Sequence, residues 1–255
     1  MHAELLELAQ KVGSAAGALL MERPPAFEIE SKSTAIDIAT QMDKKAEQFI
    51  VQSLLAARPN DGIIGEEGSS IPSQSGITWV IDPLDGTVNY FYGLPGWNVS
   101  IAAKDEQGSI VGVVTAPTIN STWWATRGGG AFYNGHAIHC NDPVEINRAL
   151  IATGFQYDVA HRTAQLSDLS KLVPLARDVR RNGAAAVDLC HVAMGALDGY
   201  YEAGLKEWDW AAGGLIATEA GAIFAQYGQE PLRTTVAAGP TLHRNLTSLL
   251  GMGAS

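Results

Sequence analysis

The sequence has few cysteines, no histidine cluster and no long apolar run, and each absence excludes a class of protein. Its two cysteines, Cys140 and Cys190, cannot build a disulfide framework, and the six histidines show no spacing that closes a zinc site with them. No apolar run approaches the length of a membrane span, and Glu4, Glu7 and Lys11 interrupt any signal-peptide core. We therefore expect a soluble, cytoplasmic protein in a reducing compartment.

Basic residues are also scarce. The chain has 17 Lys and Arg against 27 Asp and Glu, and its formal net charge is −10. It holds no block of Lys or Arg, which argues against binding to nucleic acid or to an anionic membrane surface. An acidic total can still hide a local basic pocket. Because 46% of the 255 residues are hydrophobic, the chain can bury a large core.

The spacing of apolar residues predicts an α/β chain. Helical spacing predicts helices over residues 2–22 and 42–58, the first ended by Pro24 and Pro25. A polar loop through Lys32 and Ser33 separates them, and residues 68–76 read as a surface loop. Short apolar runs predict half-buried or buried strands at 27–31 and 61–64, and an antiparallel sheet with strands at 79–81, 99–104, 110–115, 122–126 and 131–133.

Beyond residue 147 the pattern changes to alternating strands and helices. The predicted strands are 150–153, 199–202, 222–225 and 235–238, and the predicted helices are 162–172, 185–196, 210–220 and 242–249. We expect the helices to pack over both sheets. The sequence therefore predicts one layered α/β domain over residues 1–255, with an antiparallel half, 1–147, and an α/β half, 148–255.

The stretch from Trp79 to Trp97 combines a buried strand with two acids. The run Trp79-Val80-Ile81 is followed by Asp82 and Asp85 across a turn fixed by Pro83. Two carboxylates about 4 Å apart repel by roughly 4 kcal/mol at an effective dielectric near 20, so a turn that gathers them needs a cation. On this pair alone, an Asx-type turn closed by Pro83 and Gly86 explains the residues at least as well.

Two more acids occur in similar settings. Glu66 follows a short apolar strand and Asp209 begins a predicted helix, so both are expected on turns where side chains can converge with Asp82 and Asp85. Mg²⁺ takes hard oxygen ligands, keeps several waters and is held by a few carboxylates together with substrate phosphate. Scattered acids at the ends of elements suit that ion. Glu67, beside Glu66, is interpreted as a surface residue or an outer partner.

These residues resemble the inositol monophosphatase family of Mg²⁺-dependent, lithium-sensitive phosphatases. The resemblance rests on Gly65-Glu66-Glu67, Asp82-Pro83-Leu84-Asp85-Gly86-Thr87-Val88-Asn89, Trp208-Asp209 and Gly221-Ala222. It runs from Lys32 and Asp43 to Gly221 in the order and approximate spacing of the family. It implies the inositol monophosphatase or sugar phosphatase-like fold, an αβαβα sandwich, and a homodimer.

The resemblance also implies the metal ligands and the catalytic residues. Glu66, Asp82 and the carbonyl of Leu84 would bind one Mg²⁺, and Asp82, Asp85 and Asp209 a second. A weaker third ion would lie near Glu66, through water. Thr87 and Asp43 would orient the attacking water, and Glu66 is the third implied catalytic residue. Asp43 has a simpler explanation as well, because the helix dipole favours an acid in the first turn of a helix.

The substrate contacts follow from the same resemblance. Gly86 and Thr87 open a predicted helix whose amides can hold phosphate oxygens. Glu202 would accept hydrogen bonds from substrate hydroxyls, although it could simply end a strand. The full implied set is Asp85, Gly86, Thr87, Gly183, Ala184, Ala185, Glu202 and Asp209. The sequence departs from the family at Ala184, where Ser or Thr is common, and at Tyr92, where His is common, and both changes bear on substrate identity.

The sequence thus predicts a phosphoric monoester hydrolase that acts on inositol 1-phosphate or a similar small polyol phosphate through metal-activated water. Two metal ions roughly 3.5–4 Å apart can serve an in-line displacement without a covalent phosphoenzyme. Histidinol-phosphate phosphatase, fructose-1,6-bisphosphatase and nucleotide 3′-phosphatase are alternatives in the same fold. A binding or regulatory protein, as some bacterial members are with the transcription machinery, is the alternative from another class, against which the intact ligand set argues.

Overall fold

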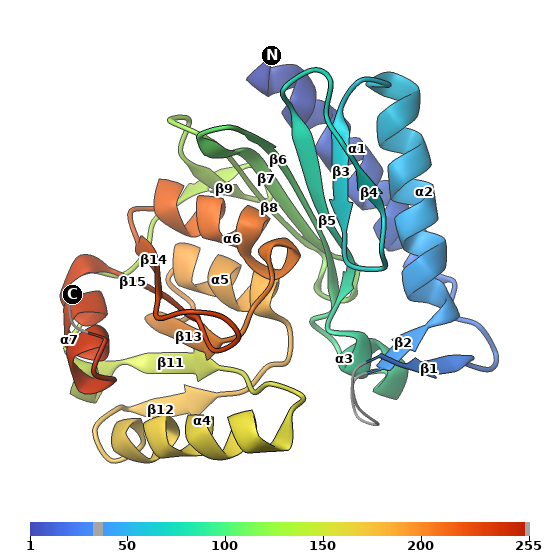
Figure 1. Cartoon of the computed structure of the whole chain (residues 1–255). Helices are drawn as coiled ribbons and strands as arrows, with labels where there is room; N and C mark the ends of the chain where they lie inside the picture. Colours follow the sequence, from blue (N-terminus) through green and yellow to red (C-terminus); the bar gives the residue numbers. More distant parts are fainter. Residues whose placement is uncertain (33–37, 253–255) are drawn as a thin grey trace.

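The computed structural model describes residues 1–32 and 38–252. Its elements stack in five layers, α, β, α, β and α, which Figure 1 shows edge-on. An eight-stranded sheet and a five-stranded sheet enclose a pair of helices, and further helices cover both outer faces. The layered sandwich expected from the sequence is confirmed.

The helices lie near their predicted positions. Their bounds are α1 (His2–Met21), α2 (Gln41–Ala57), α3 (Thr87–Tyr92), α4 (Val159–Leu172), α5 (Ala185–Ala193), α6 (Glu207–Glu219) and α7 (Pro240–Leu249). Thr40 and Asp43 form a capping box that begins α2. α6 begins three residues earlier than expected, so Asp209 lies in its first turn. Among the described residues, no helix combines the length and the apolar character that crossing a membrane requires.

The larger sheet has the order β10-β9-β8-β7-β6-β5-β3-β4. All of its neighbours pair antiparallel except β3 and β5, which are parallel. Its strands are β3 (Gly62–Gly65), β4 (Ser70–Ile71), β5 (Thr78–Asp85), β6 (Asn98–Asp105), β7 (Gly108–Ala116), β8 (Ser121–Thr126), β9 (Ala131–Tyr133) and β10 (His136–Ile138). The carboxyl ends of β3 and β5 therefore lie side by side.

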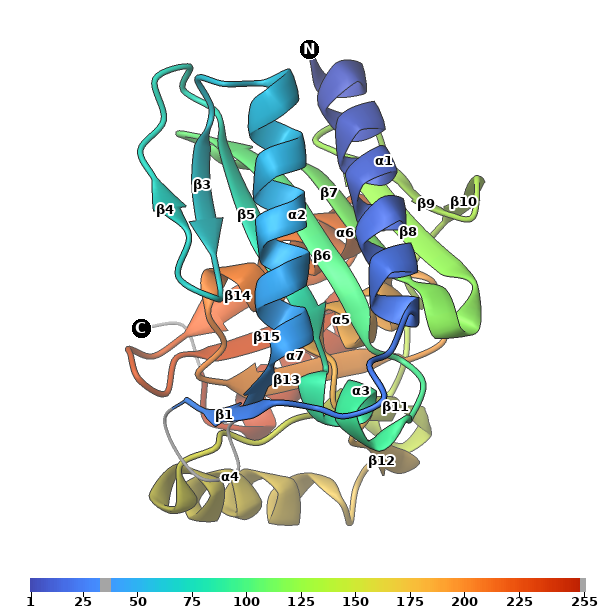
Figure 2. The same cartoon turned by 90° about the vertical axis from the view of Figure 1, so that its right-hand side faces the viewer.

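The smaller sheet has the order β12-β11-β13-β15-β14. Its strands are β11 (Leu150–Thr153), β12 (Asp178–Arg180), β13 (Gly199–Ala203), β14 (Ile223–Tyr227) and β15 (Thr234–Ala238). β11 pairs parallel with β12 and β13, and the remaining pairs are antiparallel. A separate ribbon joins β1 (Ile29–Ser31) to β2 (Ile38–Thr40) near α3 (Figure 2).

Three apolar clusters hold the layers together. α1 and α2 cover one face of the larger sheet, and α5 and α6 fill the space between the two sheets. A third cluster joins α4 and α7 to the outer face of the smaller sheet. The middle cluster takes side chains from both halves of the sequence, so both halves build the layer that carries α5 and α6.

The structure corrects several local expectations. Asp82 and Asp85 do not lie on a turn after strand 79–81, because β5 continues to Asp85. Its pairing with β6 shifts register between these two residues, where Pro83 has no N–H to give to the ladder.

Other differences lie at the edges of the sheets. The predicted loop 68–76 contains the short edge strand β4. The strand predicted at 27–31 is exposed, because β1 pairs only with β2. Ser33 lies outside the described residues.

Close contact between α6 and the larger sheet depends on a glycine. A Cβ built on Gly112 of β7 would lie 2.8 Å from the carbonyl oxygen of Ala212 in α6 and 3.0 Å from its Cα. These are backbone atoms, so a side chain at this position can be accommodated only by moving the helix from the sheet. α1 lies on the opposite face, where Gly13 meets side-chain atoms of Thr115, Ile101 and Val113.

We expect Gly112→Ala to destabilise the fold by about 1–3 kcal/mol, the usual cost of overpacking a close-packed core. Gly13→Ala is the matched control, because its neighbours are side-chain atoms that can shift and because alanine is favoured over glycine inside a helix by about 1 kcal/mol. Urea denaturation measures both changes. Equal stability of the two variants would show that the contact at Gly112 does not limit the spacing of these layers.

Candidate active site

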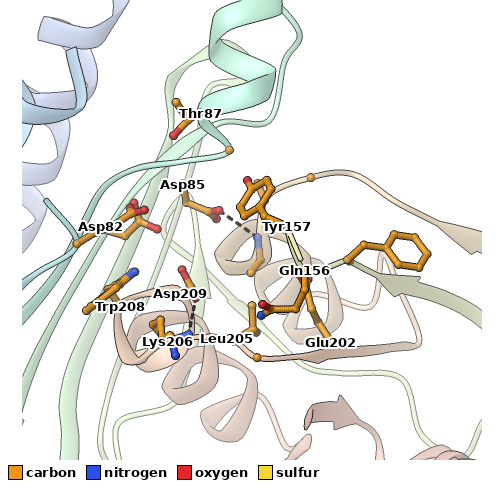
Figure 3. A pocket seen from close by; sticks show the side chains of 18 of the residues that line it. Asp82, Asp85, Thr87, Gln156, Tyr157, Glu202, Leu205, Lys206, Trp208 and Asp209 are labelled. Carbon is orange, nitrogen blue, oxygen red and sulfur yellow. Dashed lines mark hydrogen bonds between the residues drawn. The ribbon is translucent and has the colours of Figure 1, made fainter. Parts of the chain in front are cut away.

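A pocket of about 460 Å³ opens where the carboxyl ends of β5 and β13 meet the amino ends of α3, α5 and α6. Figure 3 shows acids of β5 and α6 on one side of it and Glu202, Gln156 and Tyr157 on the other. All the expected metal and substrate residues line this pocket. They are Glu66, Asp82, Leu84, Asp85, Gly86, Thr87, Gly183, Ala184, Ala185, Glu202 and Asp209.

Four carboxylates interact electrostatically in this pocket. Burial raises the pKa of Asp82 well above its usual range, and the negative charges of Glu66, Asp85 and Asp209 raise it further. Burial likewise raises the pKa of Asp85, to about 6, against the hydrogen bonds that it accepts. Acids from positions 66 to 209 of the sequence are thus brought together in one pocket, where their negative charges repel one another.

Asp85 is fixed by three donors. Its Oδ1 accepts the N–H of Ala185 at 3.2 Å, and its Oδ2 accepts the N–H of Ala186 and the Nδ2 of Asn98, both at 2.8 Å. Ala185 and Ala186 are the first residues of α5, and Ala184 gives this helix no side-chain cap. Asp85 therefore satisfies the free amides of α5 from a strand of the other sheet, where the helix dipole also favours its charge.

The neighbouring acids accept hydrogen bonds from backbone amides close to them in the sequence. Asp82 Oδ1 accepts the N–H of Leu84 at 3.0 Å, and Asp209 Oδ2 accepts the N–H of Lys206 at 2.6 Å. The second bond closes the first turn of α6 and ties the acid to the helix start. These bonds restrict the carboxylates to the pocket side of β5 and α6.

Asp43 reaches the pocket through Thr87. The Thr87 hydroxyl lies 2.9 Å from Asp43 Oδ1 and 3.1 Å from the carbonyl oxygen of Leu84, so its proton can go to either acceptor. Asp43 Oδ2 accepts the N–H and the hydroxyl of Thr40, both at 2.7 Å. Asp43 is fully buried and does not line the pocket itself. Burial raises its pKa, although the bonds from Thr40 oppose the change.

The turn after β3 places Glu66 against a lysine. Lys32 Nζ lies 2.8 Å from Glu66 Oε1 and also pairs with Glu67. Buried Glu47 of α2 holds this turn by accepting the N–H groups of Glu67 and Ser69 at 2.8 and 2.9 Å. Lys32, which the sequence places in a polar loop, therefore contributes to the pocket, because its ammonium neutralises part of the charge on Glu66.

The opposite side of the pocket is built around Glu202 of β13. Tyr200 donates its hydroxyl proton to Glu202 Oε2 at 2.6 Å, and burial raises the pKa of Glu202 to about 7. A Cβ on Gly154, in the loop after β11, would lie 1.9 Å from the same oxygen, so any larger residue there would displace the Glu202 carboxyl group. Gly183 has a φ of +88°, which a glycine adopts without strain, and it carries the backbone past this site.

A chain of partly buried hydrogen bonds supports the turn at Gly183. Asn89 of α3 donates Nδ2 to the carbonyl oxygen of Asn182 at 2.7 Å, and Asn182 donates Nδ2 to Asp188 Oδ1 at 2.6 Å. Asp188 is 2% exposed, and burial raises its pKa to about 8. The turn between β12 and α5 is thereby held from both helices.

The structure adds pocket residues that the sequence did not identify. The loop Gly154 to Asp158 follows β11 and lines the pocket together with His161, Arg181 and Lys206. The position of Gly154 directly after a predicted strand was the available signal. Nothing in the sequence pointed to Asn98, which lies inside a strand. Tyr92 is 71% exposed and does not line the pocket, so its departure from the family lies away from the candidate site.

The donor set fits a hard divalent cation by its chemistry. Glu66, Asp82, Asp85 and Asp209 supply carboxylate oxygens, and the mutual repulsion recorded at Asp82 is what a cation would relieve. Within residues 1–32 and 38–252, no three His, Cys, Asp or Glu side chains are already arranged to hold a metal ion. Binding would therefore require these side chains to move closer together, and Mg²⁺ generally completes its coordination shell with water and phosphate oxygens.

Comparison with known proteins places this geometry in a known family. The model of the inositol monophosphatase family matches residues 1–251. An inositol-1-monophosphatase of Mycobacterium leprae is 42% identical over 203 residues, which cover 76% of this chain and 70% of that protein. A Nus factor SuhB of Haemophilus influenzae is 38% identical over 245 residues, or 93% and 91% of the two chains. The native structure of the extragenic suppressor protein suhB of Bartonella henselae superposes with a TM-score of 0.91 at 30% identity, covering 98% of this chain and 100% of that one.

Asp188→Asn should stabilise the protein increasingly as the pH rises. The folded chain holds the Asp188 proton to about pH 8, whereas an ordinary aspartate releases it near 3.8. The stability that the protonated acid contributes is therefore complete below the lower value and is lost as the pH rises through the higher one. We expect the variant to gain on the wild type by at most about 1.4 kcal/mol per pH unit across this window.

Urea denaturation in the presence of a chelator, at about pH 5 and about pH 8, measures this difference. Asp178→Asn is the control, because Asp178 lies exposed on β12 and hydrogen bonding to Arg180 lowers its pKa. A difference between wild type and Asp188→Asn that stays constant with pH would contradict the raised pKa.

Proposed function

The chain belongs to the inositol monophosphatase family, and we propose that it is a Mg²⁺-dependent phosphomonoesterase acting on inositol 1-phosphate or a similar small polyol phosphate. The observation that carries the proposal is the pocket in which Asp82, Asp85 and Asp209 lie opposite Glu202, with Glu66 in the same lining. The acids supply oxygen ligands for a cation, which could in turn bind phosphate, and the opposite side supplies an acceptor for hydroxyl groups. This one pocket would therefore be sufficient for hydrolysis of a phosphate ester.

The proposed ligands of the ions are Glu66, Asp82, the carbonyl of Leu84, Asp85 and Asp209. Mg²⁺ bound there would lower the pKa of a water and neutralise charge on the phosphoryl oxygens. The chain supports these ligands with backbone amides at Asp82, Asp85 and Asp209. Holding these carboxylates together costs free energy of folding when no cation is bound, and a bound cation would offset that cost.

Thr87 and Asp43 would orient the attacking water. The Thr87 hydroxyl donates to buried Asp43, so its oxygen can accept a proton of a water that stands in the pocket. The carboxylate of Asp43 fixes which way that hydroxyl points, because Thr40 occupies its other oxygen. Gly86 and Thr87 begin α3 and line the same pocket, so the free amides of this helix start would suit phosphate oxygens.

We propose that Glu202 recognises the hydroxyl-bearing part of the substrate by hydrogen bonding. Its carboxyl group is buried and already accepts the hydroxyl proton of Tyr200, so it suits a neutral hydroxyl better than a second phosphate. This favours inositol 1-phosphate or a similar polyol phosphate over fructose 1,6-bisphosphate and nucleotides. Histidinol phosphate stays the closest alternative, because a cationic amine would also suit a carboxylate.

A second candidate function is suggested by the relatives themselves. The Haemophilus influenzae protein, 38% identical over most of this chain, is named a Nus factor. A binding or regulatory role is therefore a candidate in place of hydrolysis or beside it. Measurement of phosphate release separates them: if the wild type and Asp85→Asn are equally inert on every small phosphate tested, the enzymatic proposal fails.

Asp209→Asn should lower kcat/KM for inositol 1-phosphate by about 100-fold or more, the size of loss seen when one electrostatic group is removed from a transition state. The amide can still accept the N–H of Lys206, so the fold should survive, as circular dichroism can verify. Glu207→Gln is the matched control, because Glu207 lies two residues earlier in α6, pairs with Lys104 and does not line the pocket. Retained activity in Asp209→Asn would remove this residue from the ligand set.

Inositol 1-phosphate should be hydrolysed with a higher kcat/KM than histidinol phosphate, fructose 1,6-bisphosphate, a nucleoside 3′,5′-bisphosphate or NADP. Each is assayed with Mg²⁺ and with chelator, and chelator should abolish phosphate release. A preference of more than about 100-fold for histidinol phosphate, equivalent to roughly 2.7 kcal/mol of transition-state discrimination, would overturn the substrate assignment and leave the reaction class standing.

A further inference from the structure

Asn98 is a buried polar residue beside the acids to which no role has yet been assigned. It lies in β6 directly opposite Asp85 of β5 and is fully buried. Its Nδ2 donates to Asp85 Oδ2 at 2.8 Å. Its Oδ1 has no hydrogen-bond partner in the part of the chain that the structure describes. The amide is therefore only half satisfied, although it is fully buried.

Half-satisfied amides are rare in protein cores, because the buried oxygen loses its water and gains nothing in return. An apolar side chain would fill this position in β6 without that loss. The nitrogen is the half that is used, since an amide oxygen placed against the carboxylate would be repelled. The bond to Asp85 is thus the only hydrogen bond that this side chain makes among the described residues.

The donors around Asp85 divide its two oxygens unequally. Oδ2 accepts from both Asn98 and Ala186 at 2.8 Å, so both of its lone pairs are occupied. Oδ1 accepts only from Ala185, at the longer distance of 3.2 Å, and keeps one lone pair. An ion in the pocket can therefore engage Asp85 through Oδ1 alone as long as Asn98 is present.

We propose that Asn98 is a positioning residue that makes Asp85 a one-oxygen ligand by holding Oδ2 away from the ion. This rests on the proposed function, because it concerns how one of the proposed ligands is presented. Without Asn98, only the α5 amides hold the carboxylate of Asp85. The repulsion of the other acids can then turn it out of its present orientation. The competing interpretation is that Asn98 merely pairs β5 with β6 at the register shift.

Direct binding of Mg²⁺ separates these interpretations. Mg²⁺ is titrated calorimetrically into the purified, metal-stripped chain, as wild type, Asn98→Leu and Asn98→Ala. Leucine has a similar size without a donor, and alanine serves if leucine does not fold. We expect both variants to bind Mg²⁺ about 10–100-fold more weakly, the usual effect of losing a partner that orients a metal ligand. The Mg²⁺ concentration for half-maximal phosphate release should rise by a similar factor, with thermal stability equal to or above that of the wild type.

Thr115→Val is the matched control. Thr115 lies in β7 opposite Val99, and its buried Oγ1 also has no hydrogen-bond partner among the described residues. The variant removes an unpaired oxygen from the same sheet without removing a donor to an acid, so Mg²⁺ binding should not change. Wild-type affinity in both Asn98 variants, with an active wild type, refutes this inference alone. A wild type that neither binds Mg²⁺ nor releases phosphate refutes the proposed function and this inference with it.

Discussion

The repulsion among four carboxylates that share one pocket is the constraint on which the candidate site depends. Burial and the neighbouring charges raise the pKa of Asp82, and the acids come from β5, from α6 and from the turn after β3. Folding must hold them together against this repulsion. Backbone amides at the starts of α5 and α6 and the ammonium of Lys32 provide the opposing interactions.

The layered fold explains how residues from distant parts of the chain meet. β5 delivers acids from the larger sheet, β13 delivers Glu202 from the smaller sheet, and the helices between the sheets turn their amino ends to the pocket. Asp85 shows this cooperation most directly, because a residue of one sheet completes the amino end of a helix that packs on the other. The hydrogen bonds that form the candidate site therefore also connect the two sheets.

Much of this arrangement could be predicted from the sequence. Apolar periodicity located the helices and most strands, and the acid motifs identified residues that the fold brings to one pocket. The extension of β5 through Pro83 was missed, because a proline and two acids resemble a turn when the partner strand is unknown. Asn98 was missed for a similar reason: its role depends on being opposite Asp85, and cross-strand register is a property of the tertiary structure. The loop Gly154 to Asp158 is irregular, so periodicity carries no information about it.

The glycine-rich contacts of the middle helices set a length. Gly213 of α6 leaves no room for a Cβ against Leu189 of α5, and Gly112 of β7 leaves none against Ala212, so α6 lies as close to α5 and to the larger sheet as these atoms allow. α6 carries Asp209 into the pocket, and β5 of the larger sheet carries Asp82 and Asp85. Two glycines outside the pocket therefore help to set how far apart its acids stand.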